Sequence, residues 1–367
     1  MEKRVAIIHD WLNGMRGGEK VLEMVLDLYP QADIYTLFLV PDRISDKIKS
    51  HRIFTSRLNR YKSLRNKYRH LLPLFPATIE DFNLQAYELI ISSSHCVAKG
   101  IIPPPDALHI SYIHSPMRYI WDQYYAYFGG QRGFKKSFIR RQLSRLRTWD
   151  VASSSRVDHF IANSNFVRDR IWKYYRREAE VIHPPIDTEF YKPLENPSKD
   201  YFLTVSALVP YKMNQLLVEA FNRMEEKLVV VGRGTEEKKL MGMAGTSVEF
   251  RRDLTDGDLK ALYQNARALV FAGVEDFGMS FVEAQACGVP VVAYNRGGIR
   301  DIIEDGVTGM LFPSQSVQGI CDALSRFKDL ERDSHRRFSA AKLRDNSLRF
   351  SVQNFKSRFK QLVDGWQ

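Results

Sequence analysis

The 367-residue chain contains few cysteines, namely Cys96, Cys287 and Cys321, and no Cys-x-x-Cys spacing. An odd and sparse set of cysteines excludes a disulfide scaffold and offers no cluster for a zinc ion, so we expect a reducing compartment. No apolar run approaches the roughly 20 residues that a membrane-spanning helix requires. Only four consecutive apolar residues precede His9, too few for the core of a signal peptide. These absences together predict a soluble protein on the cytoplasmic side of the membrane.

Acidic residues are missing from two stretches in the first half of the chain. Lys47–Pro76 contains nine Lys or Arg residues interleaved with Tyr, Phe and Leu, and Gln131–Trp149 contains seven. The formal net charge of the whole chain is +11, of which residues 1–200 carry +9 and residues 201–367 only +2. The basic excess therefore belongs to the first half. Such stretches are either solvated helix faces or surfaces that attract a polyanion, nucleic acid or an anionic membrane.

The first basic stretch also carries apolar side chains at helical spacing. Basic residues lie between them, and this arrangement predicts an amphipathic helix at a membrane interface. The four apolar positions are Leu58, Tyr61, Leu64 and Tyr68.

Short apolar runs alternate with helical patterns through the first half of the chain. Continuous apolar runs are typical of parallel strands buried on both faces, and their alternation with helices indicates an α/β sheet. We predict strands at Val5–Ile8, Ile34–Leu37, Glu88–Ser92, Ile110–His114, Asp158–Ala162 and Glu180–Ile182, with helices opening at Glu19 and over Phe166–Tyr175.

The same alternation restarts in the second half, after the polar segment 191–200, which contains two prolines and which we predict to be a linker. Strands are predicted at Phe202–Ser206, Leu228–Val231, Val248–Phe250, Ala268–Phe271, Val289–Tyr294 and Gly309–Phe312. Helices are predicted at Asn214–Asn222, Asp256–Asn265, Phe281–Cys287, Val317–Phe327, Arg332–Arg344 and Ser351–Val363. The predicted fold is α/β, with two doubly wound Rossmann-like domains facing each other across a cleft. Ligands of such sheets bind at the carboxyl ends of the strands.

The strongest local pattern is Val274–Pro290, in which an apolar strand leads through a loop into a helix. Glu275 lies in the loop, and Glu283 lies about one turn into the helix. Amides of residues 278–280 at the start of this helix would be donors for an anion. A loop carboxylate can accept sugar hydroxyls, and an acidic residue one turn inward can hold a ribose diol. The alternative is that Glu275 only caps the helix and Glu283 makes a surface ion pair.

Four weaker signals lie at other predicted strand ends. Lys212 follows a strand and a turn and can neutralise a phosphate, although a lysine there can also be merely solvated. Gly17 and Gly18 open a helix whose amides could meet an anion. His114 ends a predicted strand, where a functional role and a structural role are about equally expected. The Gly-rich turn at Gly232 is a weak signal by itself.

Taken in order, these motifs resemble those of the retaining glycosyltransferases of family GT4, which have the GT-B fold. The resemblance covers nearly the whole chain and is strongest from Phe160 to Pro313. It rests on EDFGMSFVEAQACGVPVVAY with its Glu-x7-Glu spacing, LVPYK, LVVVGRGTE, GGIRDIIEDGVTGMLF, FIANSNFVRDRI, VIHPPID and RGGEKVLE.

The resemblance implies a role for each matching residue. Lys212 would bind the donor diphosphate, and Glu283 would bind the ribose. Glu275 would hold the donor sugar, and His114 would lie beside the transferred sugar. The remaining donor-binding positions implied are Gly17, Gly18, Asp253, Phe277, Gly278, Met279 and Ser280, with Phe277 to Ser280 acting through their backbone.

It also implies an organisation into an acceptor-side domain over residues 1–190, the linker 191–200 and a nucleotide-sugar domain over residues 201–350. A final helix within residues 351–367 would cross back to the first domain.

The chain departs from the family pattern near the expected phosphate and base. The family often has Gly-Arg where this chain has Ser206-Ala207, so the usual arginine partner of Lys212 is missing. Arg233, or Arg251 and Arg252, could supply that charge. The family's Phe-Leu-Gly base loop reads Phe-Arg-Arg here, and Asp301 stands where the family favours Glu.

The implied activity is transfer of a hexose from a nucleoside diphosphate with retention of anomeric configuration. The residues of these motifs are most similar to those of bacterial GDP-mannose-dependent mannosyltransferases of O-antigen or exopolysaccharide assembly. This similarity predicts a lipid-linked oligosaccharide or polysaccharide acceptor. No Asp-x-Asp sequence lies at a plausible strand end, so we expect no divalent metal and no cofactor besides the nucleotide sugar.

A UDP-glucose-type glucosyltransferase, a nucleotide-sugar epimerase and a non-catalytic nucleotide-sugar-binding protein stay open as alternatives. With a lipid-linked acceptor, the basic stretches 47–76 and 131–149 would hold the first domain on the inner face of the plasma membrane. We expect a peripheral membrane protein and no nucleic-acid partner.

Overall fold

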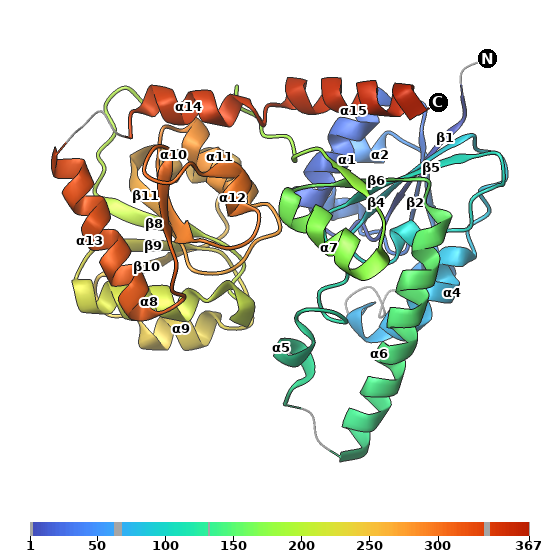
Figure 1. Cartoon of the computed structure of the whole chain (residues 1–367), viewed down its shortest axis with the longest axis horizontal. Coiled ribbons are helices and arrows are strands. Elements are labelled where there is room, and N and C mark those ends of the chain that lie inside the picture. Colours follow the sequence, from blue (N-terminus) through green and yellow to red (C-terminus); the bar gives the residue numbers. More distant parts are fainter. Residues whose placement is uncertain (1–2, 62–67, 131–132, 334–337, 367) are drawn as a thin grey trace. The chain divides into compact units, whose positions relative to one another are not determined.

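The computed structural model describes residues 3–61, 68–130, 133–333 and 338–366. The chain forms two compact units (Figure 1). Unit 1 comprises Met1–Pro185 together with Phe355–Gln367, and unit 2 comprises Ile186–Asn354. Each unit is built on one parallel sheet, as the alternation of strand and helix patterns predicts.

Unit 1 contains a seven-stranded sheet in the order β3-β2-β1-β4-β5-β6-β7. Every strand pair within it is parallel, and the order reverses between β1 and β4. This reversal defines the edge at which α/β sheets bind ligands. The strands are β1 (Val5–His9), β2 (Asp33–Thr36), β3 (Ile53–Thr55), β4 (Leu89–Ser94), β5 (Leu108–Ile113), β6 (His159–Ala162) and β7 (Ala179–Val181).

Amphipathic helices cover this sheet. In α1 the buried residues Val21, Leu22, Val25 and Leu26 recur at helical spacing and pack on the sheet. The helices of unit 1 are α1 (Gly17–Leu28), α2 (Asp46–Lys49), α4 (Phe75–Glu80), α5 (Tyr124–Phe128), α6 (Gly133–Ser153) and α7 (Asn165–Tyr175).

The last helix, α15 (Val352–Trp366), packs on unit 1 although the segment before it belongs to unit 2. Phe355, Phe359 and Val363 are buried in the same core cluster as the β1 side chains Val5 and Ile7. The spacing of four residues aligns these three side chains on one face of the helix.

The predicted interfacial helix through Leu58 and Tyr61 is not present in the described residues. Arg57–Arg60 and Tyr68–Leu74 are short 3₁₀ helices, and residues 62–67, which include Leu64, lie outside the described residues. Leu58 packs against the core of unit 1. The prediction was wrong over residues 57–61, where a short 3₁₀ helix ends at Arg60 and Leu58 packs against the core, and at Leu64 it stays a prediction. Tyr61 is 63% exposed.

Unit 2 has a six-stranded parallel sheet in the order β10-β9-β8-β11-β12-β13, the strand order of a Rossmann fold. Its strands are β8 (Tyr201–Val205), β9 (Leu228–Val231), β10 (Val248–Arg251), β11 (Ala266–Phe271), β12 (Val291–Tyr294) and β13 (Gly309–Phe312). Its helices are α8 (Asn214–Met224), α9 (Glu237–Met243), α10 (Asp256–Asn265), α11 (Met279–Ala286), α12 (Ile299–Ile302), α13 (Val317–Asp333) and α14 (Ala340–Leu348).

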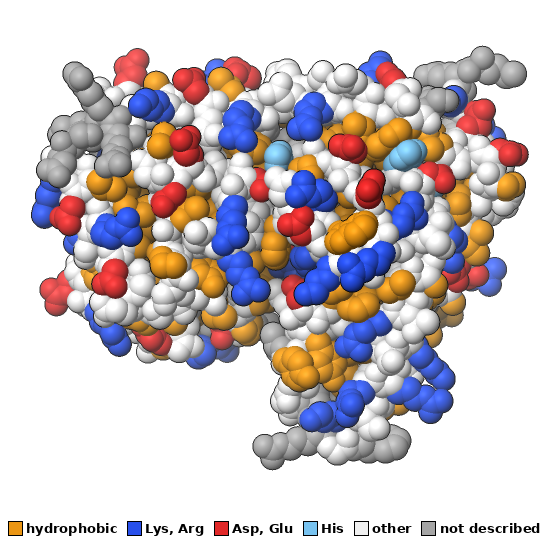
Figure 2. All heavy atoms as spheres, viewed as in Figure 1, with side chains coloured by type: hydrophobic (Ala, Val, Ile, Leu, Met, Phe, Trp, Pro, Cys, Tyr) orange, Lys and Arg blue, Asp and Glu red, His pale blue; other side chains and the backbone are white. Residues whose placement is uncertain are grey.

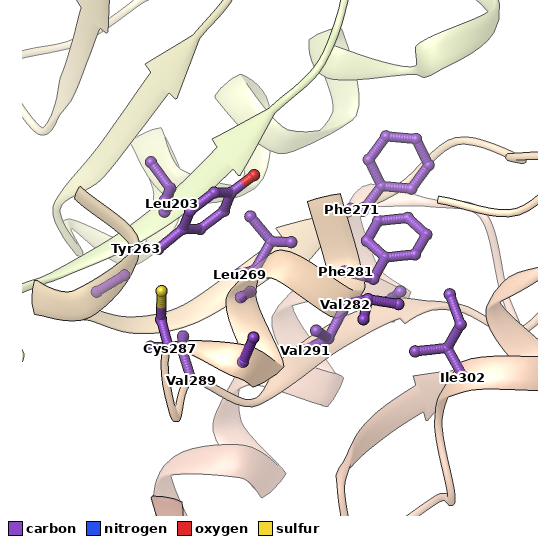
Figure 3. Packing of buried hydrophobic residues seen from close by; sticks show 14 of the residues in the cluster. Leu203, Tyr263, Leu269, Phe271, Phe281, Val282, Cys287, Val289, Val291 and Ile302 are labelled. Atoms are coloured by element: carbon purple, nitrogen blue, oxygen red, sulfur yellow. The ribbon is translucent and has the colours of Figure 1, made fainter. Parts of the chain in front are cut away.

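Figure 3 shows the core on one face of this sheet, where Tyr263 of α10 lies near Leu203 and Leu269 and where Phe271 lies beside Phe281. The aromatic rings of Phe271 and Phe281 meet edge to face with centroids 5.1 Å apart. This packing anchors α11 against the end of β11. The loop that carries Glu275 connects these two elements.

Two predicted boundaries differ from the structure. The division between the units falls after Pro185, so residues 191–200 lie in unit 2, and Tyr191 is buried against the ring of Tyr263. The helix predicted over Arg332–Arg344 is replaced by the end of α13 and by α14, and residues 334–337 lie outside the described residues. Ser339 caps α14 by accepting a hydrogen bond from the amide of Lys342.

No helix in the described ranges is both long and apolar enough to cross a membrane.

A buried histidine in the sheet of unit 1 makes the stability of this unit depend on pH. His109 on β5 is fully buried, its Nδ1 donates to the carbonyl oxygen of Arg156 at 3.0 Å, and its Nε2 lies 2.9 Å from Ser92 Oγ. Burial lowers the pKa of His109 from 6.5 to about 4. Between these two pH values the His109 side chain binds a proton in the unfolded chain but not in the folded chain. The free energy of unfolding therefore decreases as the pH falls through this window.

We expect the free energy of unfolding to fall between about pH 7 and about pH 4.5, with His109 contributing about 2 kcal/mol of that loss. His109→Gln should remove this part of the pH dependence. All five tryptophans of the chain belong to unit 1, so urea titrations followed by tryptophan fluorescence report this unit alone. The same pH dependence in the variant and the wild type would contradict the assignment.

Candidate active site

The predicted residues Lys212 and Glu275 meet at the carboxyl edge of the sheet in unit 2. Lys212 ends a 3₁₀ turn after β8, and Glu275 lies in the loop after β11. Because β8 and β11 are adjacent where the strand order reverses, both side chains lie at the switch point of this sheet. The Lys212 ammonium forms an ion pair with Glu275 Oε1, and the two side chains are only 9% and 20% exposed. The spacing in the sequence did not predict this pairing.

Close backbone packing holds this pair in place. A Cβ atom at Gly273 would lie 2.9 Å from both Cα and the carbonyl oxygen of Lys212, so only glycine fits where the two loops cross. On the other side, the amide of Gly298 donates to the carbonyl oxygen of Glu275 at 2.9 Å. The loops after β8, β11 and β12 therefore position the ion pair through main-chain contacts.

Helix α11 begins directly beyond Glu275. Gly278 is its N-cap with φ +104°, a conformation that favours glycine, and Met279 and Ser280 form the first turn. Amides at the start of a helix have no carbonyl partner one turn earlier within that helix, so they can donate to an anion. Phe277 is buried in the core, with its ring 5.5 Å from Phe350, so only its backbone is left for such a site, and the predicted contact of that backbone with the donor stays a prediction.

Glu283 lies one turn into α11 and is 7% exposed. Its Oε2 accepts a hydrogen bond of 2.9 Å from the hydroxyl of Tyr263, which is fully buried. Burial and the nearby Glu283 carboxylate raise the pKa of Tyr263 well above its ordinary value, so the hydroxyl keeps its proton and donates. The alternative of a surface ion pair for Glu283 is excluded by this burial. Tyr263 is a supporting residue that sequence reasoning missed.

The predicted base-binding residue Asp253 pairs with Arg233, and both side chains are more than 60% exposed. The other two arginines considered as partners of the donor phosphate are also paired, Arg251 with Glu249 at 2.6 Å and Arg252 with Glu237 at 3.3 Å. Within the described residues, the ion pairs of these three arginines are thus with Asp253, Glu249 and Glu237. The replacement for the family arginine at Ala207 therefore stays a prediction.

In unit 1, His114 follows β5 at the carboxyl edge of its sheet, one residue beyond the strand. Its Nε2 lies 2.8 Å from Ser93 Oγ at the end of β4, and the same oxygen lies 3.0 Å from Nδ1 of His9 at the end of β1. The Cβ position of Gly18 would be 3.5 Å from the ring of His9 and 3.6 Å from that of His114. The start of α1, where Gly17 and Gly18 were predicted to bind an anion, therefore lies against both imidazoles.

A buried carboxylate orders the neighbouring loop. Asp10 is fully buried and accepts four backbone hydrogen bonds of 2.7–2.8 Å from residues 95–98. Its Oδ2 also lies 3.2 Å from Nδ1 of His95, and burial lowers the pKa of His95 despite this carboxylate. Sequence reasoning missed His9, Asp10 and Ser93, although the polar pair His9-Asp10 at the end of the first strand was a usable signal.

The second basic stretch lies on α6, which extends away from the sheet of unit 1 (Figure 1). An open groove of about 660 Å³ runs between α5 and α6. Tyr125 is 83% exposed and Phe138 is 55% exposed, and Figure 2 shows basic and hydrophobic side chains together on this projecting part. Among the residues that the structure describes, the groove is lined by aromatic and basic side chains without an acidic one: Trp121, Tyr124, Tyr125, Phe128, Lys136, Arg140, Arg141 and Arg147, with Gly129 and Ser144.

Among the described residues, no group of three or more His, Cys, Asp or Glu side chains is arranged to hold a metal ion. Whether the reaction uses a metal is not decided by this arrangement, and the expectation of no divalent metal stays a prediction.

The two parallel-sheet domains with Rossmann strand order define the GT-B fold. Sucrose-phosphate synthase from Thermosynechococcus elongatus superposes with a TM-score of 0.76 at 18% identity, over 100% of this chain and 99% of that chain. Anabaena HepE in complex with UDP and glucose superposes with a TM-score of 0.70 at 16% identity, over 99% and 100% of the two chains. At such low identity, these similarities establish the fold.

Family models match both halves of the chain. Residues 17–190 match Glycosyltransferase Family 4, and residues 185–344 match Glycosyl transferases group 1. Together the two matches span residues 17–344, so the chain is similar to the family 4 glycosyltransferases over most of its length.

Curated relatives match over part of their length. A D-inositol 3-phosphate glycosyltransferase from Streptomyces bingchenggensis is 28% identical over 204 residues, which are 46% of this chain and 45% of that protein. A GDP-mannose-dependent alpha-(1-6)-phosphatidylinositol monomannoside mannosyltransferase from Mycolicibacterium smegmatis is 29% identical over 206 residues, which are 47% and 53% of the two chains. The chain therefore spans about half the length of the curated relatives it matches.

Proposed function

We propose that the protein is a retaining glycosyltransferase that moves a hexose from a nucleoside diphosphate to a lipid-linked oligosaccharide or polysaccharide acceptor. The observation that carries the proposal is the ion pair of Lys212 and Glu275 at the switch point of unit 2. The start of α11 and the Glu283 carboxylate follow Glu275 in the same segment, Val274–Pro290. A cation, helix-start amides and two carboxylates match the phosphates, sugar hydroxyls and ribose diol of a nucleotide sugar.

In the proposed reaction, the bond between the anomeric carbon and the diphosphate oxygen breaks while a bond to the acceptor oxygen forms on the same face. The acceptor hydroxyl gives its proton to the departing phosphate, so no protein nucleophile is required. Lys212 and the amides of Met279 and Ser280 stabilise the charge that develops on the diphosphate. The proposal assigns Glu275 and His114 to the sugar.

Mannose and GDP are the proposed donor sugar and nucleotide. The residues of the sequence motifs support this donor, and one curated relative is a GDP-mannose-dependent mannosyltransferase. UDP-glucose is the second candidate, because one of the solved structures with the same fold is Anabaena HepE in complex with UDP-glucose.

The donor is tested by thermal-shift measurements with GDP, UDP, ADP and TDP and their sugars. We expect a selective rise of Tm with GDP and GDP-mannose, and none in a Glu283→Ala variant if that carboxylate holds the ribose. A selective rise with UDP and UDP-glucose would replace the donor assignment. NMR of the product in a transfer assay then gives the anomeric configuration, and inversion would contradict the proposed mechanism. Binding without transfer to any lipid-linked acceptor would favour a nucleotide-sugar-binding protein.

The groove between α5 and α6 supports a membrane-bound acceptor. Its aromatic side chains, of which Tyr125 is exposed, and its basic residues match a surface of anionic lipid. We propose that this part of unit 1 lies on the cytoplasmic leaflet and keeps the enzyme near its acceptor. The contribution of residues 47–76 is part of the same proposal, although residues 62–67 lie outside the described residues.

Liposome sedimentation tests this attachment. The wild-type protein should pellet with anionic vesicles and stay in solution with neutral ones. Each basic residue near the surface contributes about 1 kcal/mol, so Arg140→Glu with Arg141→Glu should lower partitioning by about 30-fold or more. The matched control is Lys238→Glu with Lys239→Glu, an exposed adjacent pair on α9 of unit 2. Equal and negligible pelleting with both vesicles would contradict the attachment, and salt-sensitive retention on duplex DNA instead would favour nucleic acid.

A further inference from the structure

Two histidines of unit 1 share one serine hydroxyl. Ser93 Oγ lies 2.8 Å from His114 Nε2 and 3.0 Å from His9 Nδ1. The bridge is buried, since Ser93 is 3% exposed and His9 is fully buried. The three side chains come from the ends of β1, β4 and β5, which are neighbours in the sheet, so the parallel register positions all of them.

Glu19 lies on the other side of His9. Its Oε1 is 3.8 Å from His9 Nε2, and its Oε2 accepts a hydrogen bond of 3.0 Å from the backbone amide of Arg16. Glu19 is 4% exposed. Burial by itself would raise the pKa of Glu19, but the interaction with His9 outweighs it and the pKa lies below its ordinary value. A carboxylate is therefore held beside His9 Nε2.

The hydrogen bonds among His9, Ser93 and His114 limit which ring nitrogens can carry a proton. A serine hydroxyl has one proton and two lone pairs, so it can donate to at most one of the two imidazoles, and if it donates to one it must accept from the other. The negative charge of Glu19 favours the proton on Nε2 of a neutral His9, which leaves Nδ1 as an acceptor. Ser93 then donates to His9 Nδ1 and accepts from His114. In this arrangement His114 carries its proton on Nε2, which leaves Nδ1 as its acceptor nitrogen.

We propose that Glu19, His9 and Ser93 are positioning residues that set the tautomer and ring orientation of His114. A basic Nδ1 on His114 would accept a hydrogen bond from a sugar or acceptor hydroxyl, a task that rests on the proposed function. The tautomer itself follows from the contacts within unit 1 and does not depend on the activity.

Long-range ¹H–¹⁵N spectra of the histidine rings at about pH 8, where an ordinary imidazole is neutral, measure the tautomer directly. In the wild type, His114 should show a protonated Nε2 and an unprotonated Nδ1, with its signals assigned by their loss in His114→Gln. Ser93→Ala and Glu19→Gln should each shift His114 toward the other tautomer. We expect turnover to fall at least tenfold in both variants, with the KM for the donor within about twofold. Ser93→Thr keeps the hydroxyl and should restore both the spectrum and turnover.

Ser92→Ala is the matched control, because Ser92 is the neighbouring buried serine of β4 and contacts a different histidine. Its Oγ lies 2.9 Å from His109 Nε2 and 2.8 Å from Ser111 Oγ. This variant should leave the His114 signals and turnover unchanged within about twofold. If the loss of any serine from this strand had the same effect, Ser92→Ala would change the His114 signals and turnover as much as Ser93→Ala does.

The outcomes separate this proposal from the proposed function. Unchanged His114 signals in both Ser93→Ala and Glu19→Gln would overturn the proposal, even in an active transferase. A shifted tautomer with unchanged turnover would overturn the link between the tautomer and catalysis. A shifted tautomer in a protein that transfers no sugar would support the tautomer assignment while the proposed function fails.

Discussion

Replacing Lys212 with alanine should lower turnover about 100-fold or more at saturating donor, with unit 2 still folded. The ammonium group of Lys212 is mostly buried and held against Glu275, so it needs no reorganisation to face a developing phosphate charge. Loss of one such preorganised donor in comparable sites costs roughly a factor of 100 to 1,000 in kcat. The measurement is kcat in a nucleotide-release assay, with the Tm of the variant as the check on folding.

The matched control is Lys239→Ala, because Lys239 also forms a Lys–Glu ion pair in unit 2, with Glu236 at 3.4 Å. It is 54% exposed and lies on α9, and its loss should change turnover less than twofold. Glu275→Ala should lower turnover at least tenfold. The double variant should lose much less than the product of the two single losses, because the two side chains are in contact. Near-normal turnover in either single variant would remove that residue from the active site.

The largest stability effect is expected at the pair of Lys99 and Asp150 in unit 1. Both side chains are almost completely buried, and Lys99 Nζ lies 2.9 Å from Asp150 Oδ1. Trp121 and Tyr175 donate hydrogen bonds of 2.8 and 3.0 Å to Asp150 Oδ2. Burial lowers the pKa of Lys99, and Asp150 opposes this shift. Because Lys99→Met leaves a buried carboxylate without its cation, it should lower the free energy of unfolding by about 3–5 kcal/mol.

Urea unfolding followed by tryptophan fluorescence measures this loss in unit 1. The control is Lys49→Met, which breaks an exposed ion pair of 3.0 Å with Asp46 and should change the free energy of unfolding by less than about 0.5 kcal/mol. Combining Lys99→Met with Asp150→Asn removes both charges and should recover part of the loss. Equal, small effects of Lys99→Met and Lys49→Met would show that the buried pair does not stabilise unit 1.

Strands buried on both faces were predictable from the sequence. The bounds of β9 and β13 agree with the structure, because each is a short apolar run ended by glycine or a polar turn. The edge strand β3, Ile53–Thr55, was missed because its side chains are only partly buried and lie within a basic stretch. Helix α6 was predicted only as a basic stretch, because buried side chains such as Leu143 and Leu146 lie among charged residues.

By itself, the sequence determined the α/β class and the loops that carry Lys212, Glu275 and His114, because apolar periodicity and glycine positions are local properties of the chain. Only the tertiary structure decided that Lys212 pairs with Glu275, that Tyr263 supports Glu283 and that Ser93 joins His9 to His114. These partners are separated by 20 to 84 residues. The order and register of the parallel strands bring them together, and these arise from the packing of the whole sheet.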